Sequence, residues 1–285
     1  NHPLTIRLPV ILPWTCDEPY LYYFTVTMGD DQVTSYFALR SFTVKPDQNG
    51  IPRICLNGQP RFQNGVLDQG YWSDGLYTPP ADEAMVFDIQ KMKDCGFNLL
   101  RKHIKVEPLR WYYHCDRLGM LVWQDLVSGG SRLDPLVIQV APFLGIHLND
   151  SRYSRFGREE EAGREQFVRD LHDTVELLRN TVSLAVWVPF NEGWGQFDSL
   201  LATQMLWEQD PTRLVDHASG WHDQGGGDFK SRHVYFRPVR LKHDKSRILA
   251  LTEFGGYSLP VPGHTAGDKP FGYRMYQSAG EYMDA

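Results

Sequence analysis

The sequence predicts an α/β fold, a (β/α)8 TIM barrel that is incomplete, with strand eight missing, and that follows a small antiparallel β module. Three observations support this prediction. After residue 50, strand-like runs alternate with amphipathic, helix-like runs. The strand-like runs are continuously apolar, as parallel strands are when helices cover both faces of a sheet. Seven of them occur within about 200 residues, which fits such a barrel without its last strand.

The N-terminal residues have a different pattern. Three short apolar segments occur there: LTIRLPVIL (4–12), YLYYFTVTM (20–28) and VTSYFALRSFTV (33–44). Gly29-Asp30-Asp31 is a hairpin turn signal between the second and third segments. Three or four strands are too few for a complete β-sandwich, so we expect part of one in residues 1–46. KPDQNG (45–50) reads as the linker to a barrel domain in residues 47–285.

Each barrel element is predicted from its own signal. The strand candidates are, in order, RFQNGVL (61–67), FNLLRKH (97–103), MLVWQD (120–125), SLAVWVPFN (183–191), RLVDH (213–217), HVYF (233–236) and RILALTE (247–253). Apolar residues at helical spacing predict helices between them at 82–95, 108–118, 159–180 and 197–209. A doubly wound sheet is the alternative, but no G-x-G-x-x-G follows the first strand.

Two segments interrupt the strand–helix alternation. Residues 126–158 are a long insertion after the third strand. Residues 218–231 are rich in glycine and too short for a good fifth helix. At the C-terminal end, residues 274–285 read as the start of a helix, so we expect the chain to end inside the seventh helix.

Composition excludes two classes of partner. The chain has 29 basic and 35 acidic residues, a net charge of −6, and no basic run. Nucleic-acid binding is therefore not expected. The longest apolar stretches have about eight residues, far fewer than the roughly 20 that a membrane span needs. Aromatic residues make up 13% of the chain and suit both a core and the binding of sugar rings.

Polar residues end every predicted strand, and active sites of (β/α)8 barrels lie at those ends. The residues are Asp68, Arg101, His103, Gln124, Asp125, Asn191, Glu192, Asp216, His217, Tyr235 and Glu253. Glu192 and Glu253 follow apolar runs on strands four and seven, which face each other across an eightfold ring. A pair of carboxylates flanking a bond is what glycoside hydrolysis requires.

The segment VWVPFNEGWGQF (186–197) shows how such a strand end is built. Apolar residues 184–190 bury the strand, and the chain reaches the surface at Asn191-Glu192. Gly193 and Gly195 allow the backbone to turn away without a Cβ clash. Apolar surroundings are expected to raise the pKa of Glu192 toward the working pH.

Several motifs resemble glycoside hydrolase family 2, which contains β-galactosidases, β-glucuronidases and β-mannosidases. CGFNLLRKHIKVEPLRWYYHCDRLGMLVWQDL (95–126) resembles the second and third barrel strands of that family. FNEGWGQF (190–197) resembles its acid/base motif, and LTEFGG (251–256) its nucleophile motif. ILPWTCDEPYLYYFTVTM (11–28) resembles the end of its immunoglobulin-like domain. The resemblance implies a fragment with part of that β-sandwich and most of the catalytic barrel.

The resemblance implies roles for the residues at the strand ends. Glu192 matches the general acid/base and Glu253 the nucleophile. Asn191 matches a residue that hydrogen-bonds the sugar 2-hydroxyl. Arg101 matches an arginine that holds the nucleophile ionised, and a guanidinium does lower the pKa of a nearby carboxyl. Tyr235 is placed like a tyrosine that hydrogen-bonds the nucleophile.

Three further residues are expected to bind substrate. His103 matches a histidine that contacts the sugar. Trp221 lies in a loop beyond a strand end, where an aromatic face stacks on a sugar ring. Asp68 lies just past the first strand, although its VLDQGYW context differs from the histidine-bearing motif of the best-known β-galactosidases.

No cofactor or metal is expected. The histidines have no H-E-x-x-H spacing, and Gln124-Asp125-Leu126 stands where metal-using relatives carry glutamate-x-histidine. The expected partner is a carbohydrate substrate, with oligomers possible through domains outside this chain. The predicted function is retaining hydrolysis of terminal β-linked sugars, first of all β-galactosides, with β-mannosides and β-glucuronides as alternatives. Two other classes stay open, a catalytically inactive sugar-binding barrel and a barrel enzyme of unrelated chemistry.

Overall fold

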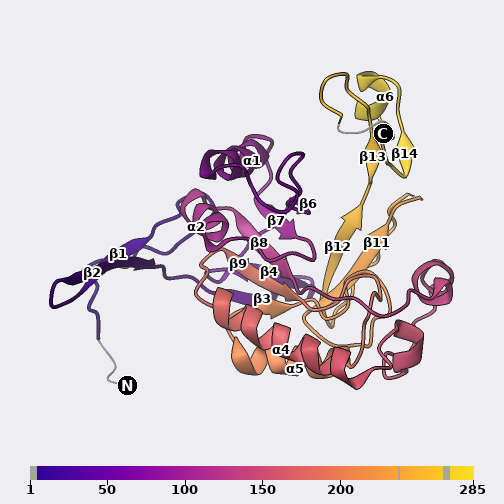
Figure 1. Ribbon diagram of the computed structural model, residues 1–285, viewed down its shortest axis with the longest axis horizontal. Coiled ribbons are helices and arrows are strands. Elements are labelled where there is room, and N and C mark those ends of the chain that lie inside the picture. The colour runs from indigo at the N-terminus through magenta and orange to yellow at the C-terminus, as the bar shows by residue number, and fades with distance from the viewer. Residues whose placement is uncertain (1–4, 237, 266–269) are drawn as a thin grey trace.

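The computed structural model describes residues 5–236, 238–265 and 270–285. At its centre lies a sheet of five parallel strands in the order β10-β9-β8-β7-β6 (Figure 1). A parallel pair, β11 and β12, lies beside that sheet. The strands are β6 (Gly65–Asp68), β7 (Leu99–Lys102), β8 (Leu121–Asp125), β9 (Leu184–Val188), β10 (Leu214–Val215), β11 (Phe229–Val234) and β12 (Ile248–Phe254).

These seven parallel strands confirm the α/β barrel architecture and the predicted order of its strands. The five-stranded sheet and the β11–β12 pair meet where the backbone N–H of Asp228 donates to the carbonyl of Val215 at 2.8 Å. In the described part of the chain the strands form an open arrangement and not a continuously hydrogen-bonded ring. The missing eighth strand therefore stays a prediction.

The helices follow the predicted positions closely. They are α1 (Asp82–Asp94), α2 (Leu109–Leu118), α4 (Glu161–Leu178) and α5 (Ser199–Gln209). In α4, the apolar residues at helical spacing are buried: Phe167, Leu171, Val175 and Leu178. Helices α4 and α5 run side by side along the sheet (Figure 1). Their apolar faces pack against outward-facing strand residues such as Trp187. This packing forms one half of the core.

The inner face of the strands forms the other half of the core. Side chains alternate between the two faces of a strand, so Leu99, Leu121 and Trp123 point inward while Leu100 and Val122 pack against the helices. Trp14 and Phe42 from the N-terminal part join the inner cluster. The first residues of the chain therefore help to close the end of the barrel opposite the strand termini.

The N-terminal module differs from the prediction. β1 (Tyr22–Met28) and β2 (Asp31–Phe37) form the expected hairpin around Gly29-Asp30, and it projects from the molecule (Figure 1). The run 33–44 breaks after Phe37, and its second half becomes β3 (Phe42–Pro46) in another sheet. The first segment, 4–12, is not a strand over residues 5–12, because Pro9 cannot donate to a ladder; residue 4 lies outside the described residues.

The expected linker is a hairpin turn. β3 pairs with β4 (Pro52–Leu56), which also pairs with the short β5 (Gln59–Pro60). In the turn, the Asp47 carboxylate accepts the backbone N–H groups of Asn49 and Ile51 at 2.8 and 3.1 Å. The division into residues 1–46 and 47–285, and the immunoglobulin-like nature of the first part, stay predictions.

The insertion and the C-terminal segment contain only short elements. The insertion holds a π-helical turn, η1 (Leu136–Val140), the short α3 (Ala141–Phe143) and a 3-10 turn, η2 (Tyr153–Phe156). The predicted terminal helix is reduced to α6 (Ala279–Met283), because β14 (Arg274–Met275) pairs with β13 (Tyr257–Ser258) instead. Strand β11 also starts and ends earlier than its candidate HVYF. Within the described residues, no helix has the length and apolarity to span a bilayer.

Candidate active site

Glu192 follows β9 in a backbone conformation that is unusual for a glutamate. Its φ is +51°, in the left-handed region that disfavours side chains with a Cβ. Its N–H donates to the carbonyl of Ser219 at 3.0 Å, which ties the end of β9 to the loop after β10. Strained conformations of this kind are found where a side chain must be held in one direction.

Gly193 and Gly195 make this turn possible, as the sequence predicted. Both have positive φ angles, +71° and +60°. A Cβ on Gly193 would meet the ring of His222 at 2.6 Å, and one on Gly195 would clash with the carbonyl of Gly129. The glycines therefore allow the Glu192 loop to pack directly against the loop after β10 and against the insertion.

Glu253 lies near the end of β12, and a tyrosine connects it to Glu192. The hydroxyl of Tyr235 lies 2.6 Å from an oxygen of Glu192 and 2.6 Å from an oxygen of Glu253. A carboxylate oxygen of each glutamate lies within 4.8 Å of the other. The structure therefore brings the two predicted carboxylates together at the mouth of the strands.

The hydroxyl of Tyr235 has a single proton, so it donates to only one of these carboxyl groups. Its oxygen lies equally close to the second carboxyl group, so the hydroxyl can donate to either glutamate. Burial and the two neighbouring carboxylates raise the pKa of Tyr235 well above its usual value, so the hydroxyl stays protonated. Tyr235 is therefore a neutral hydrogen-bond donor shared between the two glutamates.

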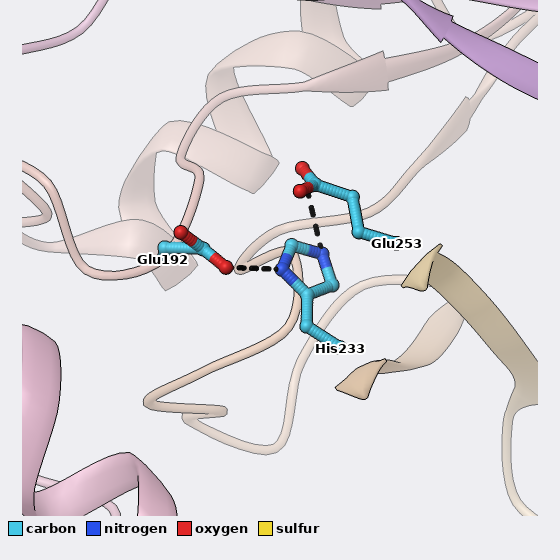
Figure 2. A group of neighbouring side chains, drawn as sticks. All are labelled: Glu192, His233 and Glu253. Atoms are coloured by element: carbon cyan, nitrogen blue, oxygen red, sulfur yellow. Dashed lines mark hydrogen bonds and ion pairs between the residues drawn. The ribbon is translucent and has the colours of Figure 1, made fainter. Parts of the chain in front are cut away.

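His233 is the third member of this cluster, and the sequence analysis did not assign it to the site. Its ring lies between the two glutamates (Figure 2). Nδ1 lies 2.8 Å from Glu192, and Nε2 lies 3.8 Å from Glu253. The only sequence signal was the His-x-Tyr spacing at the end of β11, which places the side chains of His233 and Tyr235 on the same side of the chain.

The pKa of Glu192 does not follow the sequence-based expectation. Burial raises the pKa of this carboxyl, but hydrogen bonds from His233 and Tyr235 and the charge of Arg101 outweigh burial and leave the pKa below its usual value. The expectation considered only the apolar strand before Glu192. The polar groups that face Glu192 come from β11 and from other parts of the chain.

Arg101 organises the other side of the pair. Its guanidinium donates to Glu253 at 3.1 Å, to Asn191 at 2.8 Å and to both oxygens of Asp125 at 2.9 and 3.1 Å. Burial alone would lower the pKa of Arg101, but Asp125 and Glu253 raise it. Arg101 therefore remains charged in a buried position.

Asp125, one of the polar residues predicted at the strand ends, supports this arrangement, although the sequence analysis gave it no role. Its carboxylate also contacts Nδ1 of His103 at 2.7 Å. Burial raises the pKa of Asp125, but Arg101 and His103 together lower it below its usual value. Its position at the end of β8, next to Arg101 in the sheet, was the available signal.

Trp221 lies at the edge of the site and Asp68 does not lie in it. The Trp221 ring is 6.4 Å from that of His233. Asp68 pairs in register with Lys102 on β7, and the two side chains form an ion pair of 2.8 Å. Neighbours in register point to the same face, so Asp68 and Lys102 point away from Arg101. The expectation that Asp68 faces the substrate is therefore not supported.

A cavity of about 460 Å³ lies on this outer side of the sheet, between β6 and α1. Its lining includes Asp68, Lys102 and Trp72 but neither glutamate of the pair. It is separate from the Glu192–Glu253 cluster.

Glu192, His233 and Glu253 also have the composition of a metal-binding group. Their contacts are already direct hydrogen bonds: Nδ1 of His233 lies 2.8 Å from Glu192, and Tyr235 contacts both carboxyl groups. Moreover, different ring nitrogens of His233 face the two glutamates. Hydrogen bonding therefore accounts for the cluster, and the absence of a required metal stays a prediction.

The comparisons with known proteins agree with one another. A family model described as glycosyl hydrolases family 2, TIM barrel domain, matches residues 73–239. A β-galactosidase of Pseudoalteromonas haloplanktis is 34% identical over 226 residues, which are 76% of this chain and 19% of that protein. A β-galactosidase of Enterobacter cloacae is 29% identical over 76% of this chain and 20% of that protein. The chain thus spans about a fifth of the length of these relatives.

Solved structures show the same fold. A β-galacturonidase from Eisenbergiella tayi has a TM-score of 0.67 and 16% identity, and the match covers 91% of this chain and 46% of that chain. A β-glucuronidase from Parabacteroides merdae has a TM-score of 0.55 and 19% identity over 79% of this chain and 26% of that chain.

Proposed function

This chain belongs to glycosyl hydrolase family 2, and from that membership we propose that it carries the active site of a retaining β-glycosidase. Glu192 is the general acid/base and Glu253 is the nucleophile. The observation that carries this proposal is the contact of one tyrosine hydroxyl, that of Tyr235, with both carboxyl groups at 2.6 Å.

The distance between the carboxyl groups supports retention of configuration. Retaining enzymes separate their two carboxyl groups by about 5–5.5 Å, whereas inverting enzymes leave about 6.5–9.5 Å for a water molecule. Oxygens of Glu192 and Glu253 lie within 4.8 Å of each other. This closeness fits the separation in retaining enzymes better than that in inverting enzymes, and it favours direct attack by a carboxylate on the anomeric carbon.

The environments of the two glutamates support their separate roles. Glu253 accepts a hydrogen bond from Arg101 at 3.1 Å, which holds its carboxyl group in place for attack. When the Tyr235 hydroxyl donates to Glu253, its hydrogen bond no longer lowers the pKa of Glu192, and Glu192 carries the proton that the first step requires. Glu192 then passes its proton to the leaving oxygen while Glu253 forms the glycosyl ester, and it later deprotonates the water that hydrolyses the ester.

The remaining residues bind and position the sugar. Asn191 is oriented by Arg101 at 2.8 Å and presents its amide group toward the 2-hydroxyl. His103 is held by Asp125, and in this proposal it binds the hydroxyls of the same ring. Trp221 supplies an aromatic face at the edge of the site. We assign no substrate contact to Asp68, whose carboxylate is paired with Lys102.

For the sugar itself we propose a terminal β-galactoside. The names of several relatives support this choice, since five similar curated proteins are β-galactosidases and a sixth is a β-galactosidase large subunit. The names of the structural neighbours include uronidases, so β-glucuronides and β-galacturonides are the competing substrates, with β-mannosides as a further alternative.

Two measurements test this proposal. A panel of nitrophenyl β-glycosides, with galactose, glucuronic acid, galacturonic acid and mannose, identifies the sugar; we expect the galactoside to turn over fastest. A 2-fluoro-glycoside of that sugar should form a stable ester, and peptide mapping should place it on Glu253. Labelling of Asp125 or Asp216 would contradict the assignment.

A further inference from the structure

A series of hydrogen bonds runs from His233 into the interior of the barrel. Nε2 of His233 lies 3.2 Å from the hydroxyl of Ser219. The Ser219 hydroxyl donates to Thr252 at 3.1 Å, and the hydroxyl of Thr252 contacts that of Ser231. Ser231 donates to Oδ2 of Asp216 at 2.9 Å. We call the three hydroxyl groups of Ser219, Thr252 and Ser231 the hydroxyl chain.

The hydroxyl chain joins three neighbouring strands and ends at a buried carboxyl group. Asp216 and Ser219 follow β10 and are completely buried. Ser231 lies on β11, and Thr252 lies on β12. Within the described residues, Oδ1 of Asp216 has no hydrogen-bond partner. A buried carboxyl group with an unpaired oxygen destabilises a fold, so packing alone gives no reason for an aspartate at this position.

The direction of each hydrogen bond follows from the number of available protons. A hydroxyl group has one proton to donate, and an ionised carboxylate only accepts. When Asp216 is ionised, Ser231 donates to Asp216, and Thr252 donates to Ser231. The proton of Ser219 points to Thr252, so the Ser219 oxygen faces His233 as an acceptor. Nε2 of His233 must then carry a proton.

Asp216 imposes this direction as long as it is ionised. Burial raises the pKa of Asp216, and the opposing effects of Arg101, His217 and the Ser231 hydroxyl do not fully cancel that rise. A neutral Asp216 could donate to Ser231, and the hydroxyl chain would then no longer fix the proton on Nε2. The direction is therefore best measured at about pH 8, far above the ordinary pKa of an aspartate.

The tautomer of His233 decides what its other ring nitrogen can do. Nδ1 lies 2.8 Å from Oε1 of Glu192 (Figure 2). With one proton held on Nε2, Nδ1 can accept the proton of a neutral Glu192 and return it. This transfer moves one proton from Oε1 to Nδ1, leaves a carboxylate and an imidazolium, and changes no other bond. A neutral histidine with its proton on Nδ1 could only donate to Glu192.

We propose that Asp216 is a positioning residue that acts through the hydroxyl chain to hold a proton on Nε2 of His233. Nδ1 is thereby kept available to take the proton of Glu192 and to give it back between the two steps of the reaction. This inference rests on the proposed role of Glu192 as acid/base, and it adds a buried residue that acts on this acid through three hydroxyl groups.

The first test reads the tautomer directly and needs no turnover. Isotopically labelled histidine is incorporated into the chain, and the ring nitrogens are observed by NMR at about pH 8. Nitrogens with and without a proton have well separated chemical shifts, and His233→Gln identifies the signals of His233 by their loss. We expect Nε2 of His233 to carry a proton in the wild type. An unprotonated Nε2 in the wild type would overturn the inference.

Two substitutions interrupt the connection. Asp216→Asn replaces a group that only accepts by an amide that can also donate, and Ser219→Ala removes the acceptor beside Nε2. In both variants we expect the proton to move largely from Nε2 to Nδ1. Asp228→Asn is the matched control, because this part-buried carboxylate binds the backbone N–H of Val215 at 2.8 Å and lies outside the hydroxyl chain. Unchanged His233 signals in Asp216→Asn, or an equal change in Asp228→Asn, would refute the proposed coupling.

Kinetic measurements separate this inference from the proposed function. Asp216→Asn should lower kcat severalfold and leave KM nearly unchanged, a smaller loss than the effect of about 10²–10⁴-fold that removal of a general acid causes. An unchanged kcat beside the expected change of tautomer would overturn the catalytic part of the inference. The expected tautomer in a protein that hydrolyses no glycoside of the panel would instead overturn the proposed function and leave the coupling between Asp216 and His233 in place.

Discussion

Nδ1 of His233 lies 2.8 Å from Oε1 of Glu192, and the histidine side chain is fully buried. Around it lie Tyr235, Glu253 at 3.8 Å, and Ser219, whose hydroxyl is 3.2 Å from Nε2. His233 is therefore a positioning residue for the proposed acid. Its contact is also one of the interactions that lower the pKa of Glu192 against the effect of burial.

The first prediction concerns pH. The first step needs protonated Glu192, so kcat/KM should fall as the pH rises through the pKa of this group. Because that pKa is lowered, the fall should begin on the acidic side of the range usual for general acids. His233→Ala removes a lowering contact and keeps the burial, so the fall should move to higher pH. His243→Ala, at an exposed position, should leave the profile unchanged. A His233→Ala profile that coincides with the wild-type profile would contradict this role.

The second prediction concerns proton donation. Glu192→Ala should slow the hydrolysis of alkyl glycosides by about 10²–10⁴-fold, since their leaving groups need the proton. Nitrophenyl glycosides should be affected much less in the first step, and added azide should restore their turnover by attacking the glycosyl ester. Glu208→Ala, on the exposed side of α5, is the control. Equal loss on both substrate types without azide rescue would remove Glu192 from this role.

The third prediction concerns the turn that carries Glu192. Gly195→Ala should lower the free energy of unfolding by about 3 kcal/mol, because its φ of +60° disfavours alanine and the new Cβ clashes with the Gly129 carbonyl. Gly225→Ala separates the two effects. The φ of Gly225 is +84°, but nothing lies within 4 Å of the added Cβ. Gly225→Ala should therefore lower the free energy of unfolding by only about 1 kcal/mol. Denaturant titrations of both variants test the difference, and equal losses would show that the clash is relieved.

The fourth prediction concerns acid stability. Asp223 forms two hydrogen bonds with Arg247, at 2.6 and 2.9 Å, and thereby ties the loop after β10 to the start of β12. Burial raises the pKa of Asp223, but its bonds to His217, Arg247 and Gly225 lower it far below the usual value. A depressed folded-state pKa stabilises the fold above the unfolded pKa of about 3.9, and this contribution disappears as the pH falls.

Asp223→Asn should therefore lower the free energy of unfolding by about 1–3 kcal/mol at pH 7. The difference in the free energy of unfolding between this variant and the wild type should shrink below about pH 4. Glu176→Gln is the control, because its ion pair with Arg179 is exposed and contributes about 0–1 kcal/mol. Urea titrations at pH 7 and pH 3 measure both. A difference that persists unchanged at pH 3 would assign the loss to packing instead of charge.

Much of this protein was determined by local sequence. The apolar runs specified the seven strands and their order, and helical spacing specified α1, α2, α4 and α5. Because the carboxyl ends of parallel strands meet at one edge, the same runs also placed Arg101, Asn191, Glu192 and Glu253 together. Periodicity carries this information, since each element must bury its own apolar face.

Other features depend on the tertiary structure and have no periodic signal in the sequence. Asp68 ends a strand as Glu253 does, but its register with Lys102 turns it to the outer face of the sheet. The break after Phe37 sends two halves of one apolar run into different sheets. The contact of His233 with Glu192 joins residues 41 positions apart, and the ring contact between Phe143 and Phe236 joins the insertion to the loop after β11. Such contacts depend on how separate loops pack against one another, because no local pattern fixes the distance between two loops.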